Sequence, residues 1–167
     1  MADKIYNTLF ICTGNSARSI MAEVTLNHLG KDRFRAYSAG SHPRGEVHPL
    51  TLQVLGDKGY AIVGLRSKSW EEFARPGAPK MDFIFTVCDR AAGEVCPTWP
   101  GQPITAHWGF ADPAAVEGDP AKKLKAFTNA QVLIANRIRT FLSLPLASID
   151  RLSLQNQLRQ MGRERPE

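Results

Sequence analysis

Short β-prone runs alternate with helical stretches along this chain, and that alternation constrains its fold more than any other feature. The β-prone runs span residues 5–11, 33–39, 81–87 and 102–108, and helical patterns occupy 17–29, 50–58, 70–73 and the segment after Pro120. Strands that alternate with helices pair in parallel and have helices packed on them. The sequence therefore predicts a single three-layer α/β domain, a four-stranded parallel sheet with helices on both faces.

The C-terminal third predicts one long helix and a tail. After Pro120 the apolar residues recur at spacings of three and four, as a buried helix face requires: Phe127, Ala130, Ile134, Ile138 and Phe141. We expect the domain to span residues 1–144. In the tail, residues 145–167, apolar residues again have near-helical spacing. We expect it to be docked on the body as a short helix, or frayed, rather than to be a partner-binding arm.

Composition restricts the class of protein. The 167 residues are 43% hydrophobic and 22% charged, as in ordinary soluble domains. The net charge of +5 favours an anionic ligand, whereas scattered basic residues without interleaved aromatics argue against a nucleic-acid partner. No apolar run approaches the roughly 18 residues of a spanning helix, and the first residues do not resemble a signal peptide. We therefore expect a cytoplasmic protein without membrane contact.

The three cysteines, Cys12, Cys88 and Cys96, are an odd number, which argues against a disulfide framework. They favour redox or nucleophilic chemistry. The alternative is that each is a small buried apolar residue.

The first strand leads directly into a loop with the pattern C-x5-R followed by serine, and the loop leads into a helix. Its residues are Cys12, Thr13, Gly14, Asn15, Ser16, Ala17, Arg18 and Ser19. Successive backbone N–H groups and the helix dipole form an anion site in such a loop, and Gly14 and Asn15 tolerate the left-handed backbone it requires. Arg18 provides a planar fork for two oxygens.

The same positive potential predicts a Cys12 pKa well below the usual value of about 8.5, with Ser19 donating a hydrogen bond to the sulfur. The loop thus predicts a cysteine that attacks the central atom of a bound tetrahedral oxyanion.

This loop resembles the active-site loop of the low-molecular-weight tyrosine phosphatase fold, and particularly of its arsenate reductase branch. Three further segments resemble arsenate reductases in the same order: Tyr37–Ser41, Phe85–Cys88 and His107–Pro113. The resemblance covers about residues 5–144 and implies reduction of arsenate to arsenite, in support of arsenic detoxification. Phosphatases usually have a second cysteine before the loop arginine and an aromatic pair after the Asp-Pro, where this chain has Ala17 and Ala114-Ala115.

The resemblance also implies roles for the remaining cysteines. Cys12 would attack arsenic, Cys88 would attack the sulfur of the adduct, and Cys96 would then attack Cys88 and pass the disulfide outward. Asp112 matches the general acid or base. No tightly bound cofactor is implied, only an external thiol reductant, either thioredoxin or glutathione with glutaredoxin. The seven residues between Cys88 and Cys96 are one more than expected, which leaves the reductant and the part played by Cys96 open.

A potassium site of some arsenate reductases is matched in part. Asn15, Glu23 and Ser38 match three of its ligands, and Lys68 stands at the place of the fourth, an aspartate. We expect the lysine ammonium to replace the ion, so that potassium is not required; the alternative is a solvated surface lysine. His42, His48 and His107 have no ligand spacing with the cysteines, and no metal site is expected.

Two other functions remain open at this point. The first is a tyrosine phosphatase that uses the same Cys12, Arg18 and Asp112, with water hydrolysing a phosphocysteine. The second is a non-catalytic module that only binds an oxyanion.

Overall fold

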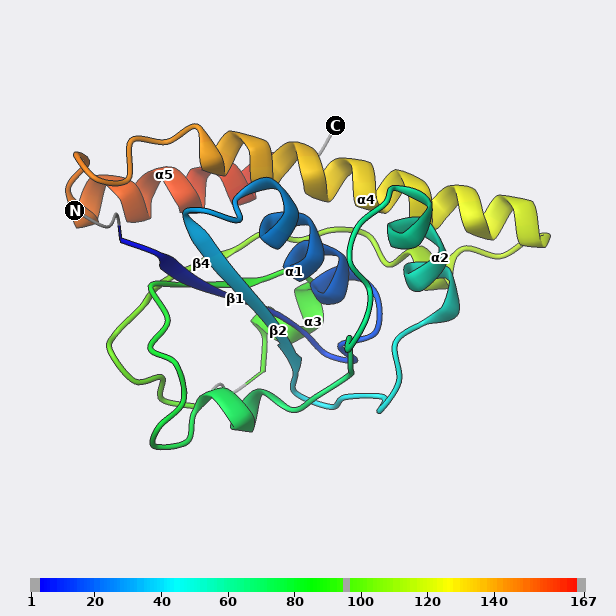
Figure 1. Cartoon of the computed structure of the whole chain (residues 1–167), viewed down its shortest axis with the longest axis horizontal. Helices are drawn as coiled ribbons and strands as arrows, with labels where there is room; N and C mark the ends of the chain where they lie inside the picture. The colour runs from blue at the N-terminus through cyan, green and yellow to red at the C-terminus, as the bar shows by residue number, and fades with distance from the viewer. Residues whose placement is uncertain (1–3, 95–96, 165–167) are drawn as a thin grey trace.

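The computed structural model describes residues 4–94 and 97–164 and contains one four-stranded sheet (Figure 1). The strands are β1 (Tyr6–Cys12), β2 (Phe34–Gly40), β3 (Phe83–Thr86) and β4 (Ile104–His107). They pair in the order β2-β1-β3-β4, and every pair is parallel. The predicted four-stranded parallel sheet is therefore confirmed.

The helices follow the strands as the alternation predicts. They are α1 (Arg18–Leu29), α2 (Pro49–Asp57), α3 (Asp89–Ala92), α4 (Pro120–Leu142) and α5 (Arg151–Arg163), with two 3-10 turns, η1 (Trp70–Phe73) and η2 (Pro113–Ala115). Pro49 and Pro120 begin their helices, where a missing N–H has no consequence. Asp119 caps α4 by accepting a hydrogen bond from the Lys122 N–H at 2.8 Å.

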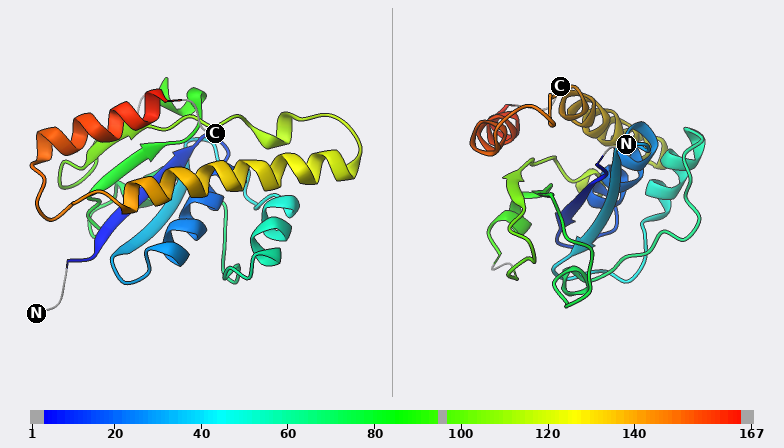
Figure 2. Two further views of the ribbon diagram at one scale, coloured as in Figure 1. Left: turned by 90° about the horizontal axis from the view of Figure 1, so that it is seen from above. Right: turned by 60° about the vertical axis from the view of Figure 1, so that its left-hand side comes forward.

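One face of the sheet packs against α1 and α4 (Figure 2). Phe141 of α4 is fully buried, and its ring centroid lies 5.2 Å from those of Phe34 and Phe83 and 5.4 Å from that of Phe85. Gln131 of α4 donates to the hydroxyl of Thr25 in α1 at 3.2 Å. This aromatic and helical layer buries one face of the sheet.

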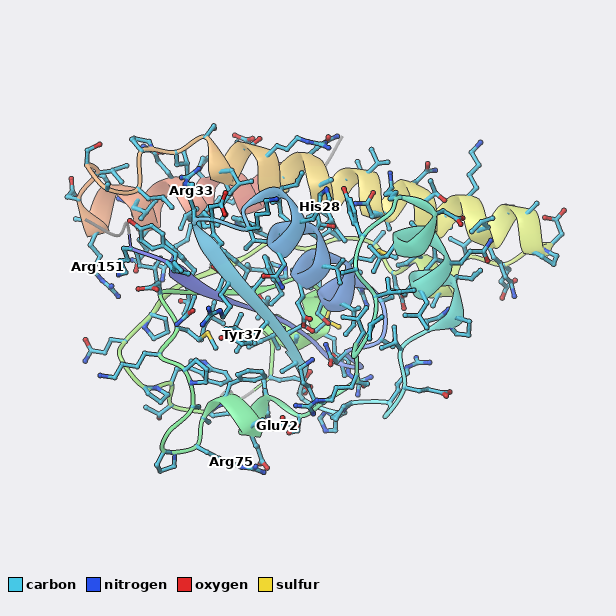
Figure 3. The ribbon with its side chains drawn as sticks, viewed as in Figure 1. His28, Arg33, Tyr37, Glu72, Arg75 and Arg151 are labelled. Carbon is cyan, nitrogen blue, oxygen red and sulfur yellow. The ribbon has the colours of Figure 1, made fainter. Side chains whose placement is uncertain are left out.

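The opposite face is covered by η1 and by loops. Tyr37, labelled in Figure 3, extends from β2 to Phe73 of η1, with ring centroids 5.5 Å apart. Trp70 of η1 makes an edge contact with Trp99 at 6.3 Å. On this face the expected helical layer is therefore a single 3-10 turn with loops.

Helix α5 lies along β4, the edge strand of the sheet (Figure 2). Arg159 donates from Nε to the Thr105 carbonyl at 3.2 Å, and Trp108 donates from Nε1 to the Leu158 carbonyl at 2.9 Å. Leu158 is fully buried. The helix thus satisfies a carbonyl of the edge strand and covers the apolar surface beside it. At the start of α5, Arg151, labelled in Figure 3, donates to the Gln102 carbonyl at 2.6 Å.

The topology places one crevice at the carboxyl ends of the strands. From β1 the chain passes to β2 on one side, and it later crosses to β3 on the other side of β1. The crevice between the carboxyl ends of β1 and β3 is therefore the topological switch point, where ligands bind in sheets of this kind. Cys12 ends β1, and Cys88 lies two residues beyond the end of β3.

Within the described residues, no helix combines the length and the apolar character needed to cross a membrane.

Candidate functional site

The loop from Cys12 to Arg18 turns its carbonyl groups away from the crevice. The carbonyls of Thr13, Gly14 and Ser16 accept backbone N–H groups from residues 42–48 at 2.9–3.0 Å. In a trans peptide the N–H points opposite to the C=O. The N–H groups that follow these carbonyls are therefore directed into the loop, as an anion site requires.

Asn15 shapes the loop. It has a φ of 46°, in the left-handed region, whereas Gly14 does not have a positive φ, so the expected left-handed backbone falls on Asn15 alone of the two. The buried Asn15 side chain donates to the Ser19 hydroxyl at 2.8 Å and accepts the Lys68 N–H at 2.9 Å. These bonds hold the loop against α1 and against residue 68.

Cys12 lies buried at the bottom of this loop, with Sγ 3.1 Å from the Ser19 hydroxyl. Because the Ser19 oxygen already accepts a hydrogen bond from Asn15, its own O–H is available to donate to the sulfur. The expected contact between Cys12 and Ser19 is therefore present in the structure.

Arg18 and Asp112 meet above the loop. Arg18 donates from one terminal nitrogen to the Phe110 carbonyl at 2.9 Å, and its other terminal nitrogen lies 3.8 Å from a carboxylate oxygen of Asp112. The Asp112 side chain, 39% exposed, also accepts the Ala114 N–H at 2.9 Å and so caps η2. Arg18 thus faces the oxyanion loop and holds the segment that carries the candidate acid.

These groups line one cavity of about 480 Å³, which also contains Cys88. Its charged side chains include the guanidinium groups of Arg18, Arg44 and Arg90 and the carboxylate of Asp112. An excess of positive charge in a partly enclosed cavity favours an anion. A second cavity, of about 580 Å³ between β3, β4 and α5, contains none of the predicted site residues, so we identify the site by its chemistry.

Cys88 approaches Cys12 from the other side of the switch point. Cys88 caps α3, because its sulfur accepts the Ala91 N–H at 3.4 Å. The same sulfur lies 3.7 Å from the Thr13 hydroxyl. It is also hydrogen-bonded to Cys12, and both cysteines are free thiols. The structure therefore brings two of the three predicted cysteines together, whereas Cys96 lies outside the described residues.

The expected lowering of the Cys12 pKa is wrong for this arrangement. The pKa of Cys12 is raised well above its usual value because its S–H donates to Cys88 and because the side chain is buried. The pKa of Cys88 is lowered to about 5, chiefly by accepting that hydrogen bond. The two sulfurs titrate as one unit. Near neutral pH this pair shares one negative charge, and the directions of the two shifts favour its location on Cys88.

Lys68 occupies the place where a cation was expected. Its ammonium lies 3.6 Å from a carboxylate oxygen of Glu23, donates to the Arg66 carbonyl at 3.0 Å, and lies 3.4 Å from the Ser38 hydroxyl. The side chain is only 9% exposed, which excludes a solvated surface lysine. Burial lowers the pKa of Lys68, and the Glu23 carboxylate partly opposes that effect.

The three histidines have separate environments. His42 lies 3.1 Å from a carboxylate oxygen of Glu94, His48 caps α2 and its ring packs on Phe127, and His107 lies between Thr86 and Asp89. Among the residues that the structure describes, no group of three or more potential metal ligands comes together.

Three charged residues near the cysteines were missed by the sequence reasoning: Arg44, Arg90 and Glu94. Arg44 follows β2, and the other two follow β3. Their position shortly after the carboxyl ends of strands was the available signal, because those ends converge on the switch point.

The fold and the site define a class. This is an α/β protein that receives a tetrahedral oxyanion over a cysteine at the end of a parallel strand. Residues 7–155 match the family described as low molecular weight phosphotyrosine protein phosphatase, and the chain belongs to this family.

The relatives and solved structures that resemble this chain include arsenate reductases. The chain is 35% identical to an arsenate reductase of Halalkalibacterium halodurans over 132 residues, which is 79% of this chain and 91% of the relative. The solved structure of an arsenate reductase in the phosphate-binding state has the same fold, with a TM-score of 0.65 and 24% identity over 83% of this chain and 98% of that one. A thioredoxin-dependent arsenate reductase of Corynebacterium glutamicum has a TM-score of 0.55 and 25% identity over 84% of this chain and 65% of that one.

Proposed function

We propose that this protein reduces arsenate to arsenite, with Cys12 as the nucleophile and Cys88 as the thiol that releases the product. The observation that carries the proposal is that Cys12 and Cys88 are free thiols that line one cationic cavity and share a hydrogen bond. A phosphatase of this family needs one cysteine, whereas a two-electron reduction by thiols needs two. The 35% identity to an arsenate reductase supports the same reaction.

The first step forms a bond between Cys12 and arsenic. Arsenate oxygens bind to the loop N–H groups and to Arg18, which stabilise the charge during displacement. The Cys12 sulfur attacks arsenic, and its proton passes to the oxygen that leaves. Asp112, which lines the same cavity, supplies the second proton, and the oxygen departs as water. Cys88 remains a thiolate throughout this step.

The second step transfers the electrons. The Cys88 thiolate attacks the Cys12 sulfur, so that a sulfur–sulfur bond forms and the sulfur–arsenic bond breaks. The bonding pair goes to arsenic, which is reduced from the +5 to the +3 state and leaves as arsenite. The two thiols are oxidised to one disulfide. The lowered pKa of Cys88, about 5, keeps this second nucleophile ionised at neutral pH.

The disulfide must then be reduced by an external thiol. We assign this role to thioredoxin, with Cys96 passing the disulfide from Cys88 outward; the thioredoxin-dependent reductase of Corynebacterium glutamicum supports that choice. Glutathione with glutaredoxin is the alternative donor. We place the reaction in the cytoplasm, where these reductants keep thiols reduced.

The lining of the cavity favours a small oxyanion. Ala114, where related phosphatases carry an aromatic residue, lines the cavity beside Asp112. A methyl group there provides little surface for stacking a phosphotyrosine ring.

The test is arsenate-dependent oxidation of NADPH, coupled either to thioredoxin and its reductase or to glutathione, glutaredoxin and glutathione reductase. We expect turnover by the wild type and none by Cys12→Ser or Cys88→Ser, with Cys96→Ser losing turnover in the thioredoxin system. Hydrolysis of p-nitrophenyl phosphate is measured in parallel. Rapid hydrolysis by the wild type, with arsenate reduction intact in Cys88→Ser, refutes the relay and supports a phosphatase. Arsenate binding without turnover under either reductant supports a binding module.

A further inference from the structure

Two carboxylates hold the short segment that carries Cys88. Helix α3 is one turn of four residues, and so short a helix is not stable by itself because its nucleation is unfavourable. At its start, Asp89 Oδ1 lies 2.8 Å from Nε2 of His107 in β4. Just beyond its end, Glu94 reaches back to the oxyanion loop.

Glu94 makes the more enclosed of these two attachments. One carboxylate oxygen accepts from the Thr13 hydroxyl at 3.0 Å, and the other lies 3.1 Å from Nδ1 of His42. The backbone N–H of His42 in turn donates to the Thr13 carbonyl at 2.9 Å. Glu94, His42 and Thr13 therefore form a closed set of contacts, and the Thr13 hydroxyl also lies 3.7 Å from the Cys88 sulfur.

The place of Glu94 is not explained by oxyanion binding. A carboxylate bonded to the anion-binding loop repels a bound arsenate. Burial acts to raise the pKa of Glu94, but the hydrogen bonds with Ser41 and Thr13 and the charges of His42 and Arg90 together keep it below its usual value, so the negative charge persists at neutral pH. What the carboxylate supplies instead is an attachment between the Cys88 segment and the loop that holds Cys12.

We propose that Glu94 is a positioning residue for the thiol-transfer step: it holds the Cys88 sulfur against Cys12 while Cys88 attacks, and Asp89 supports the other end of the segment. The inference rests on the proposed function, because it concerns the step in which the Cys12–arsenic bond breaks and the disulfide forms. Attack requires the two sulfurs to be held close and aligned, and loss of alignment slows a reaction steeply. The Glu94 side chain is 18% exposed, whereas that of Asp89 is 94% exposed. We therefore expect the Glu94 attachment to be the stronger of the two, because solvent weakens an exposed ion pair.

The experiment compares Glu94→Ala, Glu94→Gln and Asp89→Asn with the wild type in arsenate reduction. We expect Glu94→Ala to lower kcat about tenfold without raising KM, because an attachment and a repulsive charge are removed together. Glu94→Gln retains an oxygen that accepts from Thr13, so its loss is smaller, about threefold. Asp89→Asn has the weakest effect. Glu71→Gln, an exposed carboxylate variant in η1, is the matched control and keeps wild-type constants.

A second measurement does not require arsenate. In a Cys96→Ser background, which leaves only these two thiols, diamide oxidises Cys12 and Cys88 to their disulfide, and the remaining free thiols are trapped with N-ethylmaleimide and counted by mass spectrometry. We expect Glu94→Ala to form this disulfide about tenfold more slowly than the wild type. Wild-type rates in both measurements, or a loss of kcat/KM that arises only from KM, overturn the positioning role. If the wild type reduces no arsenate but Glu94→Ala still slows disulfide formation, the proposed function fails and the positioning role stands.

Discussion

At the scale of single residues, the chemistry depends on how Cys12 and Cys88 share one proton. The loop around Cys12 has the N–H groups, the helix N-terminus and the arginine that favour a thiolate. Burial and the hydrogen bond to Cys88 act in the opposite direction and raise the pKa of Cys12. The directions of these two shifts favour the anion on Cys88, the sulfur that attacks second in the proposed reaction.

This division predicts a specific titration. Replacing Cys12 by alanine removes the S–H that donates to Cys88, so the pKa of Cys88, about 5 in the intact pair, rises by about one unit or more. Thiolate absorbance at 240 nm, followed from pH 4 to pH 10, measures it. A titration of Cys12→Ala with its midpoint still near pH 5 contradicts the shared proton.

The lowered pKa of Cys88 also predicts how the free energy of unfolding depends on pH. The pKa of Cys88 in the folded protein, about 5, lies below the ordinary value of a cysteine thiol, so the stabilisation that its ionisation provides is complete above the ordinary value and is lost as the pH falls toward about 5. The free energy of unfolding of the wild type should therefore fall more between pH 8 and pH 5 than that of Cys88→Ser. Urea denaturation at several pH values compares the two, and parallel curves count against the assignment.

The charge of Lys68 is expected to affect both the stability of the fold and the binding of arsenate. Lys68→Met keeps the length of the side chain but leaves Glu23 without its ammonium partner, which is expected to cost about 1–3 kcal/mol of stability. It also disturbs the segment whose N–H bonds to Asn15, so arsenate KM should rise. For the wild type, exchange of KCl for NaCl at constant ionic strength should leave kcat/KM unchanged. A Lys68→Met variant as stable as the wild type in urea refutes the role.

At the scale of elements, the end of β2 packs directly against the oxyanion loop. A Cβ added to Gly40 would lie 2.5 Å from the Thr13 carbonyl oxygen and 3.0 Å from Cβ of Asn15. Both contacts are closer than atoms normally approach, so the loop has to move. The tightly packed contact between Gly40 and the loop does not absorb such a displacement.

Gly40→Ala is therefore expected to lower kcat/KM for arsenate more than about tenfold, because displacing the loop N–H groups weakens stabilisation of the oxyanion. Gly56→Ala is the matched control: the added Cβ meets only Ile62 at 3.5 Å, and alanine favours the helix by about 1 kcal/mol. Steady-state kinetics with circular dichroism separates the loss of activity from unfolding. Equal activity of the two variants shows that the close contact is tolerated.

Elements that depend on local pattern could be predicted from the sequence. The apolar pattern and Asn15 predict the segment that runs from β1 through the loop into α1. Pro120 and the periodicity after it predict the start of α4. The strands predicted at 81–87 and 102–108 are shorter in the structure, at Phe83–Thr86 and Ile104–His107, because neighbouring apolar residues such as Met81 and Trp108 are buried by tertiary packing.

The contacts that decide the site could not be predicted locally. Thr13 and Glu94 are 81 positions apart, and the single turn of α3 is too short to show a helical period. The spacing of Cys12 and Cys88 suggested a relay through resemblance alone. The local loop pattern favoured a thiolate on Cys12. Only the three-dimensional arrangement, which places Cys88 beside Cys12, indicates that Cys88 is the sulfur with the lowered pKa.

At the scale of the whole molecule, α5 is part of the domain core rather than an appendage, although the family match ends at residue 155, within this helix. Leu154, Leu158 and Met161 are buried against the body, and Arg137 of α4 donates to the carbonyl of Met161. We propose that residues 145–163 stabilise the sheet edge and leave the oxyanion site unchanged.

Leu158→Ala tests this division between stability and chemistry. The side chain is fully buried, so its truncation leaves a cavity and should lower the free energy of unfolding by about 2–5 kcal/mol. The bond from Trp108 uses the Leu158 backbone carbonyl and survives the substitution, so the measured loss reports burial alone. Leu152→Ala, in the same helix but 66% exposed, should change stability by less than about 0.5 kcal/mol. Urea denaturation measures both variants, and arsenate KM should match the wild type in each; equal stabilities of the two variants would mean that α5 contributes nothing to the core.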